Sequence, residues 1–316
     1  MTKKVSDIIN CDSPVKEAIF EIQLYIKAIE ENVALYKEKS FEKRIESVDF
    51  IEFHVIDQIE GLLRKADQPD ELIGLKYHAE KIKAELEKID INLFQKLQAN
   101  IRAGGYTRKG FKNLINEYVD FNLDDNQRQE EIGYDNLDIF INGLFPFQDM
   151  PEQTKELEPE MVYYQKTPAR IVIELAEKSH FMNEDVFFDL GSGLGQVAIL
   201  INLLAGITVK GVEFEPAFCN YARDCAAALN LSDVTFINTD ARKADYSEGT
   251  VFFMFTPFRG EILQDVLEIL RKESLHRKIK IITYGPCTAQ VALQSWLSSA
   301  DPYNGNIYKL GVFSSL

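Results

Sequence analysis

An aspartate and a glycine-rich loop lie close together in the sequence VFFDLGSGLGQ, residues 186–196. An apolar run ends at Asp189, and an apolar segment, VAILINLLA, resumes after Gln196. The loop between them holds three glycines, Gly191, Gly193 and Gly195. Glycine adopts the positive φ values that other residues avoid, and it lets a ligand approach the backbone closely. A strand, a glycine turn and a helix in this order open nucleotide-binding sheets, in which the positive end of the helix faces the ligand.

Two further carboxylates follow the next two predicted strands. Glu213 ends the β-branched run at 207–213, about twenty residues past the loop, where nucleotide-binding folds place the carboxylate that binds the ribose hydroxyls. A carboxylate can accept two hydrogen bonds at once, as a vicinal diol requires. Asp240 follows the predicted strand at 234–238, and its alternative interpretation is a solvent-facing turn residue. Because parallel strands end at one edge of a sheet, the sequence predicts that the three carboxylates share a site.

The string D-L-G-S-G-L-G-Q resembles the first motif of class I S-adenosylmethionine (AdoMet) methyltransferases. Its glycines are spaced GxGxG, whereas dinucleotide-binding dehydrogenases use GxGxxG, so the spacing disfavours a dehydrogenase. The resemblance implies that the loop accommodates the methionine and ribose of AdoMet, that Asp189 holds the amino group and that Asp240 and Ala241 meet the adenine. The full set of cofactor-binding residues predicted in this way is Tyr164, Thr167, Asp189, Gly191, Ser192, Gly193, Gly195, Gln196, Glu213, Asp240, Ala241 and Thr256.

The loop, the following VAILINLLAG and the later GVE are similar to DOT-type histone lysine methyltransferases over about residues 167–240. The resemblance does not extend to the first half of the chain or to the Asn-rich substrate motif of that family. Residues 255–258 read FTPF, with Phe255 where amino-group methyltransferases often carry Asn. A phenyl ring cannot accept a hydrogen bond from an acceptor nitrogen, so methylation of nucleic-acid bases is disfavoured. The substrate-side candidates are Thr256, Phe258 and Tyr284.

The segment 158–178 precedes the glycine loop and contains a predicted helix that begins at Thr167 or Pro168. In class I methyltransferases such a segment often folds over AdoMet. By this resemblance Tyr163 and Tyr164 line the cofactor site or the methyl-transfer channel. The alternative is that both tyrosines only pack at the junction between two domains.

Strands and helices alternate from residue 186 to the C-terminus, with further strands predicted at 250–255, 279–284 and 307–314. This alternation predicts an α/β fold with a doubly wound, mostly parallel sheet, Rossmann-like as in class I methyltransferases. In the first half, apolar residues recur at three- and four-residue steps, which predicts an all-α bundle of amphipathic helices. Charged runs such as 42–44 are expected on its solvated faces. The predicted domains are a helical domain at 1–150 and an AdoMet-binding domain at 151–316.

The chain has 316 residues and a net charge of −15. Nucleic-acid affinity comes largely from clustered Lys and Arg, so an acidic chain is a poor candidate for nucleic-acid binding. The four cysteines form no CxxC pair, no metal-ligand spacing is visible, and no apolar stretch has the length of a membrane span. We therefore expect a cytoplasmic protein with reduced thiols and no metal or membrane partner.

The sequence thus predicts an enzyme that transfers a methyl group from AdoMet to a protein side chain, with lysine as a candidate, or to a small molecule. The alternative is an AdoMet-binding interaction protein that works through its helical domain without robust turnover. The oligomeric state and the methyl acceptor stay open.

Overall fold

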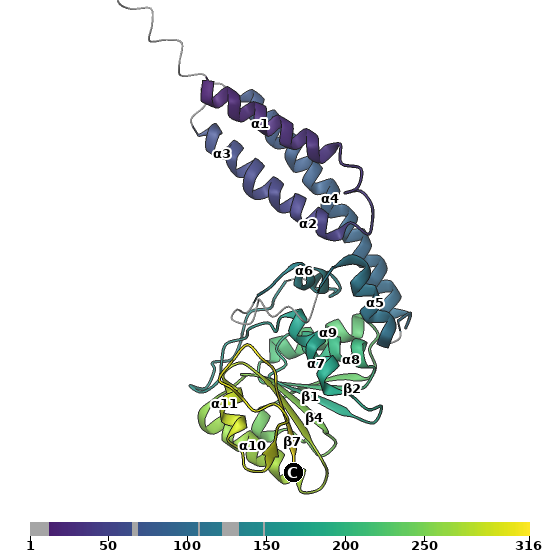
Figure 1. Cartoon of the computed structure of the whole chain (residues 1–316), viewed down its shortest axis with the longest axis vertical. Coiled ribbons are helices and arrows are strands. Elements are labelled where there is room, and N and C mark those ends of the chain that lie inside the picture. The colour runs from purple at the N-terminus through teal and green to yellow at the C-terminus, as the bar shows by residue number, and fades with distance from the viewer. Residues whose placement is uncertain (1–12, 65–68, 107, 122–132, 148) are drawn as a thin grey trace, which may run out of the picture. The chain divides into compact units, whose positions relative to one another are not determined.

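The structure is a computed structural model that describes residues 13–64, 69–106, 108–121, 133–147 and 149–316. These residues form two compact units (Figure 1). The first unit reaches Lys96 and includes 117–119, and the second comprises 97–116 and the chain from Asp120 onward. Each unit is described separately below.

The first unit is a bundle built from long helices, which confirms the predicted helical region. Its apolar core includes Ile22, Val55 and Leu86, each of which belongs to a run of apolar residues at helical spacing. A π-helical segment, η1, connects α2 directly to α3, so the three form one continuous helical stretch. The bounds are α1 (Ser13–Glu30), α2 (Phe41–Phe50), η1 (Ile51–Ile56), α3 (Asp57–Leu63) and α4 (Asp70–Arg102), of which α4 contributes its residues up to Lys96.

Arg44 is the largest fully buried side chain of the bundle, with no exposed surface. Its Nη2 donates to Oδ1 of Asp90 at 2.6 Å, and Nη1 and Nη2 donate to the carbonyls of Leu35 and Glu38, each at 3.0 Å. The expectation of a solvated face over 42–44 is therefore wrong for Arg44. The physical reason is that the guanidinium satisfies the backbone carbonyls of the turn between α1 and α2, which water would otherwise solvate.

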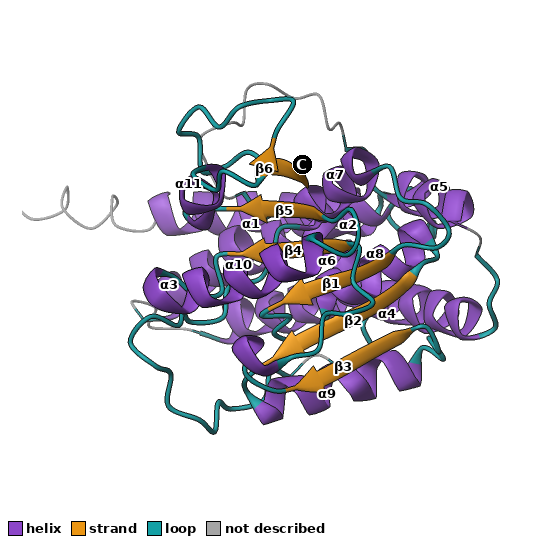
Figure 2. Ribbon diagram, turned by 90° about the horizontal axis from the view of Figure 1, so that it is seen from below, coloured by secondary structure: helices purple, strands orange, loops and turns teal. Residues whose placement is uncertain are grey.

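The second unit contains a seven-stranded sheet in the order β3-β2-β1-β4-β5-β7-β6 (Figure 2). The strands β1 to β5 pair in parallel, and β7 runs antiparallel between β5 and β6. This topology confirms the predicted fold class. The bounds are β1 (Val186–Leu190), β2 (Thr208–Glu213), β3 (Val234–Asn238), β4 (Val251–Phe255), β5 (Lys280–Tyr284), β6 (Leu297–Ser298) and β7 (Gly311–Ser315).

Helices cover both faces of the sheet, which explains why the central strands are apolar throughout. In Figure 1, α7, α8 and α9 lie on one face and α10 and α11 on the other. The backbone N–H of Ala169, the first residue of α7, donates to Oδ1 of Asp138 at 2.8 Å, so a side chain from α6 (Asn136–Gly143) satisfies the start of this helix. The bounds are α7 (Ala169–Ser179), α8 (Gln196–Ala205), α9 (Pro216–Ala228), η3 (Ala241–Lys243), α10 (Gly260–Ser274) and α11 (Cys287–Ala292).

The second unit also includes α5 (Arg108–Tyr118) up to Asn116 and α6 (Asn136–Gly143). Nε2 of Gln98 donates to the carbonyl of Gly143 at 3.0 Å, and Nε of Arg102 donates to the carbonyl of Ala228 at 2.7 Å. These bonds group the end of α4 with the second unit. The compact units therefore divide at residues 96–97, whereas the predicted domains divide at residue 150.

Three cysteines of the described residues, Cys219, Cys225 and Cys287, are buried free thiols, and Cys11 lies outside the described residues. Among the helices formed by the described residues, none combines the length and the apolarity that crossing a bilayer requires.

Candidate active site

The glycine loop after β1 has the backbone conformation that its sequence predicts. The φ values are 76° at Gly191, 52° at Gly193 and 81° at Gly195. A Cβ atom at these positions would overlap Pro257, Tyr164 and Phe236, respectively. Each glycine is thus required by the close approach of a protein side chain as well as by its φ value.

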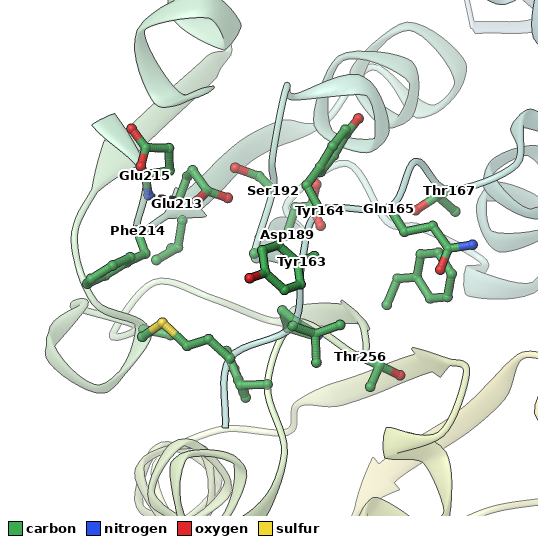
Figure 3. A pocket seen from close by; sticks show the side chains of 18 of the residues that line it. Tyr163, Tyr164, Gln165, Thr167, Asp189, Ser192, Glu213, Phe214, Glu215 and Thr256 are labelled. Carbon is green, nitrogen blue, oxygen red and sulfur yellow. Dashed lines mark hydrogen bonds between the residues drawn. The ribbon is translucent and has the colours of Figure 1, made fainter. Parts of the chain in front are cut away.

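Three polar side chains next to this loop are buried, and each has one oxygen atom without a hydrogen-bond partner among the described residues. Asp189, Ser192 and Gln196 are 3%, 6% and 4% exposed. Among the described residues, Oδ2 of Asp189, Oγ of Ser192 and Oε1 of Gln196 have no hydrogen-bond partner. All three residues line one cavity of about 310 Å³, and Figure 3 shows Asp189 and Ser192 in it. A buried polar atom without a partner is costly, so these atoms indicate a ligand that supplies hydrogen-bond donors.

The electrostatics of Asp189 agree with this interpretation. Burial, together with the nearby charge of Glu213, raises the pKa of Asp189 to about 8. A cationic donor in the cavity would favour the charged carboxylate and reverse this shift. Asp189 is therefore placed to bind an ammonium group.

Glu213 ends β2 and faces the same cavity. Its Oε2 accepts a hydrogen bond from the backbone N–H of Gly193 at 2.7 Å, and its Oε1 accepts one from Glu215 at 2.8 Å. Burial is the main cause that raises the pKa of Glu213. The backbone N–H of Phe214 also interacts with this carboxylate, and because a carboxylate has about four lone-pair sites, it can still accept a hydrogen bond from a ligand hydroxyl.

Glu215 also lines the cavity, but its carboxylate is occupied. Its Oε1 accepts from Oγ1 of Thr154 at 2.6 Å and from the backbone N–H of Ala217 at 3.0 Å, and its Oε2 accepts from the N–H of Lys155 at 2.8 Å. Glu215 thus caps α9 and fixes the segment before the glycine loop. This leaves Glu213 as the better candidate for a ribose diol.

Asp240 lies after β3 and lines the cavity together with Ala241. Its Oδ1 accepts from the backbone N–H and Nε of Arg242 at 2.8 and 3.0 Å, and its Oδ2 accepts from Nη2 at 2.6 Å. The hydrogen bond from Arg242 is the main cause that lowers the pKa of Asp240. An adenine amino group at Asp240 would therefore share this carboxylate with Arg242.

A segment that we call the strap, residues 153–165, forms one wall of the cavity and contributes seven of the lining residues: Gln153, Leu157, Met161, Val162, Tyr163, Tyr164 and Gln165. Met161 forms an isolated antiparallel bridge with Phe258, and the N–H of Val162 donates to the carbonyl of Pro257 at 3.0 Å. Tyr164 packs against Phe218 at a ring distance of 5.6 Å.

The substrate-side candidates separate into two groups. Thr256 and Phe258 line the cavity, whereas Tyr284 is not among its lining residues. Tyr284 is 1% exposed and packs against Phe255 at a ring distance of 5.0 Å. Oγ1 of Thr256 donates to the carbonyl of Tyr284 and accepts from the N–H of Cys287, both at 3.1 Å. The hydroxyl of Thr256 therefore holds the turn after β4, and the structure leaves Tyr284 outside the cavity because its ring is needed in the core.

Most of the predicted cofactor residues meet at the cavity. Gly193 and Gly195 lie outside its lining. The predicted residues that line it are Tyr164, Thr167, Asp189, Gly191, Ser192, Gln196, Glu213, Asp240, Ala241 and Thr256.

Ile307 and Tyr308 line the cavity although the sequence did not single them out. Both lie before β7, in a stretch that was predicted as part of the last strand, and β7 begins only at Gly311. The N–H of Gly285 donates to the carbonyl of Ile307 at 3.0 Å, which draws this loop onto the turn after β5. The sequence carries one signal for this loop, the dipeptide Asn304–Gly305, which is typical of a tight turn.

A known family model matches part of the second unit. Residues 157–251 match the family model described as histone methylation protein DOT1. A search of the curated proteins found no match.

Among solved structures, an RNA methyltransferase from Salinibacter ruber in complex with S-adenosylhomocysteine shares 23% identity over 48% of this chain and 92% of its own, with a TM-score of 0.39. A methyltransferase from Aquifex aeolicus, described as SAM-dependent, shares 17% identity over 46% of this chain and 92% of its own, with a TM-score of 0.38. The match of residues 157–251 and the seven-stranded sheet around them identify the second unit as a class I, AdoMet-dependent methyltransferase domain that resembles DOT1.

Proposed function

We propose that this protein binds AdoMet in the cavity of the second unit and transfers its methyl group to a protein side chain, with lysine as the first candidate. The observation that carries the cofactor assignment is the group of three buried unpartnered atoms on Asp189, Ser192 and Gln196. The ammonium group of AdoMet is a donor that fits the two acceptors, and its carboxylate fits the hydroxyl of Ser192. When bound, AdoMet supplies a methyl group that its sulfonium already activates.

The residues of the chain position the reactants and exclude water, which is what such a displacement needs from a protein. Glu213 would hold the ribose, and the strap residues Leu157 and Met161 cover the cavity with apolar surface. Thr256 and Phe258 stand at the end of β4, on the side where the acceptor would enter.

The support for a lysine acceptor is the DOT1 match together with the lining of the acceptor side. Phe255, Phe258 and Tyr308 are aromatic, and Tyr163 is 78% exposed on the strap. Aromatic walls can receive an aliphatic stem and orient a cationic or neutral amine at its end. A small molecule with an apolar body is the other acceptor that such walls would admit.

The described lining residues include four carboxylates, Asp189, Glu213, Glu215 and Asp240, all at the ends of β1 to β3 or just after them. The acceptor side near β4 and β5 has no Asp, Glu, His, Lys or Cys among its described lining residues. A lysine amine would therefore lose its proton to solvent before transfer. Because free lysine titrates near pH 10.4, the rate is expected to rise between pH 7 and 9.

The test is incubation of the full chain with methyl-labelled AdoMet and host lysate, separated into protein, nucleic-acid and metabolite fractions. We expect label in one protein band that is absent for Gly193→Arg. Label confined to metabolites would replace the protein acceptor with a small molecule. AdoMet binding by calorimetry without transfer into any fraction would favour the interaction protein instead. We also propose a cytoplasmic location, because three buried cysteines of the described residues are free thiols.

A further inference from the structure

Arg242 joins two carboxylates that come from distant parts of the sequence. Its Nη2 donates to Oδ2 of Asp240 at 2.6 Å and to Oε1 of Glu158 at 2.7 Å. The side chain of Asp240 is 9% exposed and that of Arg242 27%, whereas Glu158 is 44% exposed. The pair of Arg242 with Asp240, which follows β3, is thus the more buried part of the bridge. The pair of Arg242 with Glu158 is more exposed and connects Arg242 to the strap.

The bridge is one of several contacts that hold the strap, and two others lie on either side of it. At one end Glu215 accepts hydrogen bonds from Thr154 and Lys155. At the other end Oε2 of Glu160 accepts from the N–H of Ile262, and its backbone carbonyl accepts from Arg259, both at 2.9 Å. Arg242 holds the strap between these ends, at Glu158.

The section of the strap beside Glu158 forms part of the cavity wall. Leu157 and Met161 flank this section, and both side chains line the cavity. Asp240 and Ala241, where the adenine is expected, line the same cavity and directly precede Arg242 in the chain. A displacement of Glu158 away from Arg242 would therefore open the cavity at its adenine end.

We propose that Arg242 is a positioning residue of the cofactor site, which holds the strap over bound AdoMet through Glu158 and slows release of the cofactor. The inference rests on the proposed AdoMet site. Asp240 contributes by orienting the guanidinium, because its two oxygens bind three nitrogen atoms of Arg242. The planar fork of an arginine can serve both carboxylates at once, which a lysine cannot do with the same geometry.

The experiment measures the dissociation rate of S-adenosylhomocysteine from the full chain by stopped-flow displacement with excess AdoMet. Glu158→Gln leaves the pair between Arg242 and Asp240 intact, and it is expected to release the ligand about two- to fivefold faster, in keeping with a partly exposed ion pair. Arg242→Gln should accelerate release at least as much. The double variant should be no faster than Arg242→Gln alone, because both changes remove the same contact.

Lys243→Gln is the matched control, since it removes one positive charge next to Arg242. The side chain of Lys243 forms no hydrogen bond or ion pair with the residues that the structure describes, and its backbone N–H, which donates to the carbonyl of Asp240 at 2.9 Å, is kept in this variant. Its release rate should equal that of the wild type, and sodium chloride should accelerate release from the wild type but not from Glu158→Gln.

Unchanged release from Glu158→Gln, or equal acceleration by Lys243→Gln, would overturn the role of Arg242. Far-UV circular dichroism and a melting curve identify any variant that fails to fold, and Glu158→Gln decides the question if Arg242→Gln is such a variant. A wild-type chain that binds neither AdoMet nor S-adenosylhomocysteine would refute the proposed function itself, which is a different outcome.

Discussion

The backbone N–H of Gly193 donates a hydrogen bond of 2.7 Å to Oε2 of Glu213. This bond connects the loop after β1 to the end of β2, so the loop expected to hold the methionine and the carboxylate expected to hold the ribose are one structural unit. The loop is also joined to β2 by the N–H groups of Gly191 and Ser192, which donate to the carbonyl of Val212 at 2.9 and 3.0 Å.

Gly193→Ala is expected to weaken AdoMet binding by more than tenfold. Its φ is 52°, and an added Cβ would overlap the ring of Tyr164. The left-handed conformation costs a residue with a Cβ about 1–2 kcal/mol, and displacement of the loop would also break the bond to Glu213. Calorimetric titration with AdoMet measures the loss.

Gly305→Ala is the control that separates the effect of backbone strain on stability from an effect on AdoMet binding. Gly305 has a φ of 93°, but an added Cβ there meets no atom within 4 Å. This variant should lose stability to a similar extent and keep the wild-type affinity for AdoMet. If both glycine variants kept wild-type affinity, the glycine loop would not belong to the cofactor site.

The elements of this site with a local signal could be predicted from the sequence. The glycine loop, Glu213 and Asp240 each follow an apolar strand, and a parallel sheet brings such positions to one edge. The strands themselves could be predicted because burial on both faces makes them apolar throughout. The short β6 had no comparable signal, since it has only two residues.

The fastenings of the strap could not be predicted. Arg242 and Glu158 are 84 residues apart, and Glu160 and Ile262 are 102 residues apart. A single ion pair or cap leaves no periodic pattern, so Glu158 and Glu160 resemble any other acidic loop residues. Arg44 is a second case, since a buried guanidinium cannot be told from a solvated one by its neighbours in the sequence.

Glu213→Gln is expected to weaken AdoMet binding by about 1.5–3 kcal/mol, the value of a hydrogen bond to a charged group. The amide keeps the size of the side chain but carries two N–H donors, one of which would face the N–H of Glu215. Titration calorimetry measures the change. Glu248→Gln is the control. It removes an exposed charge that pairs with Lys210 on β2, the strand that ends in Glu213, and the variant should bind AdoMet normally. A larger loss of AdoMet affinity for Glu215→Gln than for Glu213→Gln would indicate that Glu215, and not Glu213, binds the ribose.

Asp189 predicts a pH dependence of stability. Its pKa is raised from 3.8 to about 8 in the folded protein, mainly by burial. Between these values the folded protein holds a proton that the unfolded chain has lost, so stability falls as the pH rises from 4 to 8. Asp189→Asn cannot titrate and should flatten this part of the profile, by up to about 1.4 kcal/mol per pH unit. Urea unfolding at several pH values tests this, and an unchanged slope in the variant would contradict it.

The same group links cofactor binding to proton release. Because an ammonium group favours the ionised carboxylate, AdoMet binding at pH 7 should release about one proton from Asp189. Calorimetric enthalpies in phosphate and Tris buffers should then differ for the wild type, and this difference should be smaller for Asp189→Asn. Equal buffer dependence in both proteins would mean that Asp189 does not meet the cationic end of the ligand.

Asp90→Ala is expected to destabilise the first unit by about 3–5 kcal/mol, because it leaves the charge of Arg44 buried without its partner. Arg44 is fully buried, and Nε and Nη2 both donate to Oδ1 of Asp90. Guanidinium unfolding followed by far-UV circular dichroism measures the cost. Lys39→Ala removes a pair with Glu117 in which both side chains are at least half exposed, and it should cost about 0–1 kcal/mol. An equal loss of unfolding free energy in the two variants would show that the buried pair of Arg44 and Asp90 stabilises the unit no more than an exposed pair does.

Thr256 combines an unfavourable backbone with two useful hydrogen bonds, and variants can separate the two contributions. Its φ of 41° is rare for a β-branched residue, and its hydroxyl joins the carbonyl of Tyr284 to the N–H of Cys287. Thr256→Ser keeps the hydroxyl and should be as stable as the wild type, whereas Thr256→Val should lose about 1–3 kcal/mol by leaving a buried N–H without an acceptor.

Thr256→Gly relieves the unfavourable φ value but loses both hydrogen bonds, so its stability should fall between those of Thr256→Ser and Thr256→Val. If urea unfolding places Thr256→Gly above the wild type, the bonds contribute less than the strain costs, and the hydroxyl of Thr256 is not what holds the turn after β4.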